Sequence, residues 1–301
     1  LSQSNALERA GGEPLLGWKA LSLGDLDQDG LVDLVAQPNG CCTVSCPELS
    51  VVLATGRRHY RARPELIETV NHANVCATLY APVGHESLLI SFAALGQCGG
   101  GSHTFYRQAG IDEVGYPRFE AAPAVGDSEI AQLALASPMG GSVADVDGDG
   151  DLDLTITTDP HHVMYRAEPE WPMTDVTSWT AIGEWGLILP PEPLGADHFM
   201  IPWSAAFLDL DRDGRVDVLY SHGADPGGEG EAKPVCPQHV TAHWNGGNWR
   251  FVDVTERLGL SALGEWRSMT VGDLDGDGDP DLGVGGLGSF HGSTATTCRP
   301  R

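Results

Sequence analysis

Asp145-Val146-Asp147-Gly148-Asp149-Gly150-Asp151-Leu152-Asp153 is an acidic segment with aspartates at positions 1, 3, 5 and 9 and glycine at position 6. The same pattern occurs at residues 25–33, 209–217 and 273–281. Alternate aspartates in a tight loop direct their carboxylates to one side, and glycine allows backbone angles that a side chain resists. Carboxylates so close together repel one another unless a cation lies between them. The pattern therefore predicts four cation sites.

Calcium is the ion that suits these loops best. Ca²⁺ takes six to eight oxygen ligands at about 2.3–2.6 Å, whereas Mg²⁺ requires a smaller and more rigid octahedron. The backbone carbonyl at position 7 and the aspartate at position 9 can complete the shell around the other carboxylates. We therefore expect about four Ca²⁺ ions. The predicted ligands are Asp25, Asp27, Asp29, Leu31, Asp33, Asp145, Asp147, Asp149, Asp151, Asp153, Asp209, Asp211, Asp213, Arg215, Asp217, Asp273, Asp275, Asp277, Asp279 and Asp281.

Two other interpretations of the acidic segments are disfavoured. An EF-hand loop shares the first six positions but requires a bidentate glutamate at position 12. Position 12 is held by Ala36, Ile156, Tyr220 and Val284. Acidic surface turns without metal would not need one ligand pattern repeated four times. Short apolar runs precede and follow each segment, as at residues 205–208 and 218–220, and such runs are typical of strands. Each loop is therefore expected to join two strands.

The spacing of the segments reveals a repeat. Their first residues are 120 residues apart (25 to 145), then 64 (145 to 209), then 64 again (209 to 273). The first gap equals about two periods, so a further copy is expected near His85. Residues 76–92 fit a strand, a short turn and a second strand, but the acidic pattern is missing there. No metal ligand is assigned to this copy.

About four strand candidates fall in each period, and four-stranded units repeated at such a spacing are typical of β-propeller blades. We predict an all-β chain that forms a single β-propeller domain over residues 1–301, with calcium-loop hairpins in its four-stranded blades. Residues 171–203 are expected to form an irregular insertion. The five recognisable repeats are placed near residues 9–70, 71–135, 136–200, 201–260 and 261–301, the last of them incomplete.

The Asp-x-Asp-x-Asp-Gly-x-x-Asp loop between strands resembles the FG-GAP/VCBS repeat of integrin-α-like calcium-binding propellers. Residues 251–260 together with residues 271–282 further resemble the cartilage acidic protein (ASPIC/UnbV-associated) group and its bacterial relatives. The resemblance implies a seven-bladed ring, for which five repeats are too few. We therefore expect an incomplete propeller or one that a second chain completes. A five-bladed ring closed by the N-terminal segment is the alternative.

Composition excludes some partners and suggests a compartment. The formal net charge is −25, so binding to a nucleic acid backbone or an anionic membrane is not expected. No run of about twenty apolar residues is present, so no membrane span is expected. The first residue is leucine, and both ends suggest processing or truncation. Millimolar calcium outside the cell and the cysteine usage together favour a secreted protein, extracellular or periplasmic.

The seven cysteines do not form a zinc motif, because no Cys-x-x-Cys pair is present. A disulfide between Cys76 and Cys98 would close the copy that lacks acidic residues. One cysteine must then remain, either as a buried thiol or paired with another chain. The seven are Cys41, Cys42, Cys46, Cys76, Cys98, Cys236 and Cys298.

No catalytic group of residues is evident. His239 and His243 have the spacing of metal ligands on a helix, but in a strand they lie about 13 Å apart. His161 and His162 are expected in a surface turn. The insertion at residues 171–203 is the first candidate for a ligand surface, because long loops often carry function. The aromatic and histidine residues in or beside it are Trp171, Trp179, Trp185, His198 and Trp203.

Two classes of function remain from the sequence. The first is a secreted, calcium-stabilised binding or cell-adhesion module for a protein or glycan. The second is a propeller subunit or domain of a secreted enzyme or metalloprotein whose active residues lie on inserted loops or a partner chain. The lack of a visible catalytic group favours the first, and the second stays open as the alternative. Co-purification of a second polypeptide would favour the second.

Overall fold

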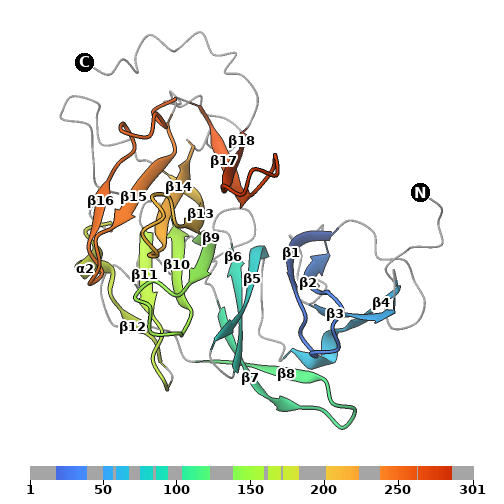
Figure 1. Ribbon diagram of the computed structural model, residues 1–301. Helices are drawn as coiled ribbons and strands as arrows, with labels where there is room; N and C mark the ends of the chain where they lie inside the picture. The colour runs from blue at the N-terminus through green and yellow to red at the C-terminus, as the bar shows by residue number, and fades with distance from the viewer. Residues whose placement is uncertain are drawn as a thin grey trace, which may run out of the picture. The chain divides into compact units, whose positions relative to one another are not determined.

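The computed structural model describes twelve stretches of the chain, and the strand pair within residues 75–93 is described by its backbone alone. These stretches consist of antiparallel strands with almost no helix (Figure 1). The all-β prediction is therefore confirmed. The described residues are 18–38, 50–56, 59–67, 75–83, 86–93, 104–122, 138–158, 162–170, 172–182, 201–223, 238–262 and 264–286.

The chain divides into two compact units. The first contains residues 1–125 and 135–138, and the second contains residues 126–134 and 139–301. Two sheets of four strands each are described in the first unit, and in both the strands pair in chain order. The first sheet is β1 (Trp18–Gly24), β2 (Asp33–Pro38), β3 (Ser50–Gly56) and β4 (His59–Arg63), which the short 3-10 helix η2 (Pro64–Leu66) follows. The second sheet is β5 (Val75–Val83), β6 (Glu86–Ala93), β7 (Thr104–Ile111) and β8 (Pro117–Ala121).

The described part of the second unit contains three sheets, again with strands that pair in chain order (Figure 1). The third sheet is β9 (Pro138–Ala144), β10 (Asp153–Thr158), β11 (His162–Arg166) and β12 (Thr174–Asp175), followed by the short helix α2 (Thr177–Thr180). The fourth sheet is β13 (Pro202–Leu208), β14 (Asp217–His222), β15 (Thr241–Asn245) and β16 (Phe251–Asp253). The fifth sheet, within the described residues, is the pair β17 (Trp266–Gly272) and β18 (Asp281–Gly286).

Each acidic segment joins the first and second strands of a sheet, as expected. In the fourth sheet, for example, the segment at 209–217 connects β13 to β14, and Leu208 pairs with Asp217 across its base. The strand, turn and strand predicted for residues 76–92 are confirmed by β5 and β6, in which Val83 pairs with Glu86. The two turn residues between them lie outside the described residues. The acidic loops therefore sit at equivalent places in four of the sheets.

The strand β14 links two cores of the second unit. All six of its residues are buried. Val218 and Tyr220 pack with Met164 of the third sheet in one apolar cluster. Leu219 belongs to a second cluster, which the partly buried Leu282 of the fifth sheet also contacts. Successive side chains of a strand point to opposite faces, so alternate residues of β14 serve the two neighbouring sheets.

The segment predicted as an irregular insertion at residues 171–203 is partly regular. It contains β12, α2 and the first residues of β13. Residues 183–200 lie outside the described part of the chain. Where the structure describes it, Trp179 is exposed, and the Nε1 of Trp203 donates a hydrogen bond to the carbonyl of Gly223 at 2.8 Å.

A group of buried histidines lies between the third and fourth sheets. His162 at the start of β11 is 3% exposed and stacks on Tyr220, with 3.8 Å between ring centroids. The expectation that His162 lies in a surface turn is therefore wrong, because β11 carries its ring into the core. His222 is also buried, and its Nδ1 lies 3.0 Å from the carbonyl oxygen of His239. Burial lowers the pKa of His222 to about 3 and also lowers the pKa of His243.

The second unit should become less stable as the pH is lowered, because His222 is buried in its neutral form. The folded state keeps this imidazole neutral down to about pH 3, whereas the unfolded chain protonates it near 6.5. Between these values the unfolded state binds more protons, so stability decreases as the pH falls. One group in this situation costs about 2 kcal/mol between pH 7.5 and pH 5. Denaturant unfolding in saturating calcium should show a pH dependence that is shallower by this amount in H222N.

The control for H222N is H59N, which removes an exposed histidine of β4. This variant should keep the whole pH dependence of the parent chain. Equal pH dependence of H222N and the parent would mean that His222 is not held neutral in the folded protein.

Candidate metal centres

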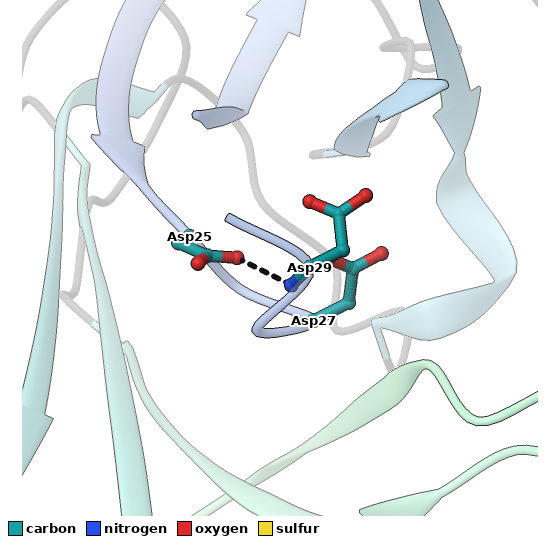
Figure 2. A group of neighbouring side chains, drawn as sticks. All are labelled: Asp25, Asp27 and Asp29. Carbon is teal, nitrogen blue, oxygen red and sulfur yellow. Dashed lines mark hydrogen bonds between the residues drawn. The ribbon is translucent and has the colours of Figure 1, made fainter. Parts of the chain in front are cut away.

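The aspartate at position 1 organises the backbone of each acidic loop. Asp145 Oδ1 accepts a hydrogen bond from Gly148 N at 2.8 Å, and its Oδ2 accepts one from Gly150 N at 3.0 Å. In the loop at 25–33, Asp25 accepts from Asp29 N at 3.1 Å, as Figure 2 shows, and also from the nitrogen at position 6. The loop at 209–217 has the same pair of donors as the loop at 25–33, and the loop at 273–281 has the same pair as the loop at 145–153. All four loops therefore share the bond from the nitrogen at position 6, whereas the second donor is at position 4 where that residue is glycine and at position 5 where it is not.

Positions 4 and 6 of the loops require left-handed backbone. The glycines at position 6 have φ angles between 84° and 95°, as in Gly30 and Gly150. Position 4 is glycine in two loops, but Gln28 and Arg212 occupy it in the others with φ of 61°. A residue with a Cβ pays roughly 1–2 kcal/mol in this region. The glycine at position 6 is thus explained by the backbone of the loop.

Replacement of Gly278 by alanine should destabilise the protein by about 1–2 kcal/mol, because its φ is +89°. A Cβ at this position meets no other atom within 4 Å, so only backbone strain is introduced. The matched control is G272A, since Gly272 lies on β17 with equally open space and no left-handed φ. Urea unfolding in calcium measures both, and equal losses would contradict this explanation.

The aspartate at position 9 has a role that sequence reasoning missed. Asp153 Oδ2 accepts from Val146 N at the start of its own loop, and Oδ1 accepts from Ala167 N just beyond β11, both at 2.8 Å. Asp33 and Asp217 make the equivalent pair of bonds. These three carboxyl groups are almost completely buried, at 0–1% exposure. Each therefore attaches the third strand of its sheet to the acidic loop.

The carboxylates of each loop converge. In the loop at 145–153, oxygens of Asp145, Asp147 and Asp153 all lie within 4.8 Å of one another. Positions 1, 3 and 9 converge in the same way in the loops at 209–217 and 273–281, whereas positions 1, 3 and 5 converge in the loop at 25–33 (Figure 2). These groups contain members of all four predicted ligand sets. Ligation by the position 7 carbonyls stays a prediction.

The electrostatics of the loops suit a divalent cation. The pKa of Asp153 is raised to about 7, chiefly by burial and in addition by the neighbouring carboxylates of Asp147 and Asp149, while the two backbone hydrogen bonds from Ala167 and Val146 oppose this rise. Burial likewise raises the pKa of Asp33 and Asp217. Carboxylates with raised pKa values are held at an electrostatic cost that a cation would relieve. The atoms available to bind a metal are all oxygens, which is the ligand type that Ca²⁺ prefers. The residues therefore fit this ion.

Loops of adjacent sheets in the second unit are connected to each other. Asn245 at the end of β15 donates from Nδ2 to the carbonyl of Val146 at 3.0 Å and to that of Val216 at 3.1 Å. Arg212 in the loop at 209–217 forms an ion pair with Asp279 in the loop at 273–281. The loops thus contribute contacts between sheets as well as within them.

The remaining sequence candidates do not converge on a site in the described residues. His239 is half-buried between strands, and His243 is buried on β15 with its Nε2 3.2 Å from Thr241 Oγ1. His161, Trp171, Trp185 and His198 lie outside the described part of the chain, as do the side chains of all seven cysteines. The proposed bridge between Cys76 and Cys98 therefore stays a prediction.

Comparison with known proteins identifies the class of repeat. Residues 227–284 match the model of the FG-GAP-like repeat family. This stretch includes the acidic loop at 273–281, the strands β15 to β17 and the first four residues of β18. The chain therefore carries an FG-GAP-like repeat, which confirms the resemblance at this level. The resemblance to the cartilage acidic protein group stays a prediction.

Two solved structures are distantly similar to the chain. A lectin from Agrocybe aegerita that recognises non-reducing terminal N-acetylglucosamine is 16% identical, with a TM-score of 0.49 over 91% of this chain and 62% of the lectin. The chain thus spans less than two thirds of that protein. MPT-1, a GDP-Man-dependent mannosyltransferase from Leishmania mexicana, is 11% identical, with a TM-score of 0.41 over 93% and 85% of the two chains. No curated protein matches the chain. Neither structural likeness says what this chain binds.

Within the described residues, no helix is long and apolar enough to cross a bilayer.

Proposed function

We propose that the chain is a secreted β-propeller module that binds a protein or glycan and is stabilised by Ca²⁺ in its four acidic loops. The observation that carries the proposal is the convergence of three carboxylates in each of four loops in which the nitrogen at position 6 donates a hydrogen bond to the aspartate at position 1. The match of residues 227–284 to the FG-GAP-like repeat supports the same class. Propellers are built from four-stranded sheets, and in the described sheets of this chain the strands pair in chain order.

In this proposal the chain's own residues hold the ion at positions 1, 3, 5 and 9, together with the carbonyl at position 7. Bound calcium supplies the positive charge that lets these carboxylates remain ionised close together. The loop then fixes the turn between the first two strands, and the position 9 carboxylate fixes the third strand to that turn. The role of the ion is therefore structural.

Secretion is part of the proposal because calcium at the concentration found outside cells suits loops of this kind. Extracellular modules bind calcium at about 0.1–1 mM, so the loops would fill outside the cell and remain largely empty at cytosolic calcium levels. The net charge of −25 is consistent with a protein that needs cations to stabilise its surface. A binding surface would then be formed by the loops between blades.

The calcium content of the dialysed protein tests the metal part of the proposal. Elemental analysis after equilibration in about 10 mM calcium, corrected for the free ion, should find about four ions per chain. D145N, D209N and D273N each remove a position 1 ligand, and each should lower the content by one ion. D175N is the matched control, because Asp175 lies on β12 outside the loops, and it should bind as many ions as the parent chain. Fewer than one ion in the parent chain would overturn the proposal.

Arrays of glycans and of extracellular proteins test the binding part. The calcium-loaded chain should retain discrete ligands, and the same chain in EGTA should lose them, because the loops that present the surface would loosen. A calcium-loaded chain that retains no ligand on either array would count against a binding module.

A further inference from the structure

Arg166 places a positive charge among the carboxylates of the loop at 145–153. It is the last residue of β11. Its Nε lies 3.0 Å from Asp147 Oδ2, and its Nη2 lies 3.5 Å from Asp149 Oδ2. Its Nη1 lies 3.9 Å from Glu168 Oε1. The guanidinium thus contacts two of the residues that would hold an ion, at positions 3 and 5.

Among the complete sheets that are described and carry an acidic loop, an arginine occupies this place on the third strand in the third sheet alone. The loop at 209–217 of the fourth sheet has a cation of its own, since Arg215 forms an ion pair with Asp213 at position 5. In each complete sheet with an acidic loop, the position 9 aspartate accepts a hydrogen bond from a nitrogen on the third strand or just beyond it. That nitrogen belongs to Ala54, Ala167 or Asn245. The residue immediately before it is Leu53 in the first sheet, Arg166 in the third and Trp244 in the fourth. Equivalent positions therefore carry a leucine, an arginine and a tryptophan.

The neutral residues at this position have other roles. Leu53 is buried in the core of the first unit. The ring of Trp244 lies under the guanidinium of Arg257, 4.2 Å from its centroid. Arg166 instead turns toward its loop, with about a third of its side chain exposed. An aliphatic side chain at this position is thus compatible with the sheet, as the first sheet demonstrates.

A guanidinium and a calcium ion cannot both be close neighbours of the same carboxylates without repulsion. A unit charge held about 5 Å from a divalent ion in a water-like medium opposes it by about 3 RT before screening by salt. The ion must also displace the guanidinium from the oxygens of Asp147 and Asp149, and exposed ion pairs of this kind are individually weak. Calcium can therefore displace the guanidinium of Arg166. The free energy needed to break its ion pairs lowers the affinity of this loop for calcium.

We propose that Arg166 is an internal counter-cation that competes with Ca²⁺ for the loop at 145–153. When calcium is scarce, the guanidinium partly offsets the charge of the loop and keeps it folded. When calcium rises, the ion displaces Arg166, so this loop fills after the loop at 25–33, for which no ion pair with a basic side chain is described. The inference rests on the proposed calcium function and adds an order of filling to it.

The variant R166L tests the inference, because leucine is the residue at the equivalent position of the first sheet. Calcium titration of the full chain in the presence of a competing chelator should show that the weakest class of sites tightens about five- to tenfold. R166Q is a second neutral variant that should tighten the site similarly if R166L folds poorly. The control R250L removes an exposed arginine from the turn between β15 and β16, and its isotherm should stay within twofold of the parent.

Stability provides a second readout with the opposite sign. In EGTA, R166L should melt below the parent chain, because the loop has lost its only internal cation among the contacts described for it. In saturating calcium the difference should shrink or reverse. A merely structural surface ion pair would lower the melting temperature equally in both conditions and would leave the calcium isotherm unchanged.

A double-mutant cycle assigns the effect to one loop. D145N removes a ligand that Arg166 does not contact, so it should delete the calcium site while leaving the ion pairs intact. In the D145N background, R166L should have no effect on the remaining isotherm. An unchanged isotherm of R166L, in a chain that binds about four ions, would overturn the role of Arg166 while the proposed function stands. A parent chain that binds no calcium would instead overturn the proposed function.

Discussion

Removal of calcium with excess EGTA should lower the melting temperature of the full chain by about 5–15 °C relative to 1 mM calcium. Sites with dissociation constants of about 0.1–1 mM each contribute about 0.4–1.4 kcal/mol at this concentration. Four such sites together contribute about 2–6 kcal/mol, which is comparable to the whole stability of many domains. The net charge of −25 acts in the same direction, because the empty loops repel themselves and one another.

Differential scanning calorimetry measures this change, and the control is EGTA that has been saturated with calcium beforehand. Magnesium at the same concentration should restore less of the lost stability, since it gives up its water less readily. A melting temperature that does not respond to the chelator would mean that the acidic loops are stable turns without a resident ion.

The second large effect is expected for D217A measured in EGTA, where no calcium contributes. The side chain of Asp217 is 1% exposed. It accepts hydrogen bonds from Leu210 N at 2.8 Å and from Asn245 N at 2.7 Å. Removal leaves the buried Asn245 N and the half-buried Leu210 N without this partner, and the loss of such a partner costs about 1–3 kcal/mol for a buried donor. Urea unfolding should therefore show a loss of about 2–5 kcal/mol.

D281A is the matched control for D217A. Asp281 is the position 9 residue of the fifth sheet, where the described contact is one hydrogen bond from the exposed Leu274 N at 2.8 Å. Its removal should cost about 1 kcal/mol or less. Equal losses for D217A and D281A would show that the bond to the third strand contributes little.

The local parts of the structure could be predicted from the sequence. The acidic loops, the strands on both sides of them and the degenerate copy at β5 and β6 depend on residues that are neighbours in the chain. The spacing of aspartate and glycine is enough to indicate a tight oxygen-rich turn. Closure of the sheets into a propeller and the number of blades depend on how whole sheets are placed, and they stay predictions.

The parts that escaped prediction depend on contacts distant in the chain. The second hydrogen bond to the position 9 aspartate comes from a distant nitrogen. This nitrogen is 14 residues from Asp153 in one loop and 28 residues from Asp217 in another. Arg166 meets its loop only because β11 pairs with β10 in one register. The burial of His162 has the same cause. The sequence predicts a surface turn at His162, but strand pairing decides where its ring lies.

The arrangement of β14 bears on how the second unit would respond to mechanical load. Val218 and Tyr220 belong to the core shared with the third sheet, and Leu219 belongs to the core shared with the fifth. A force that pulls this strand out of its sheet would open both cores at once. The three described sheets of this unit therefore should not unfold one after another as independent elements. They should unfold in one cooperative step, which the extraction of β14 initiates.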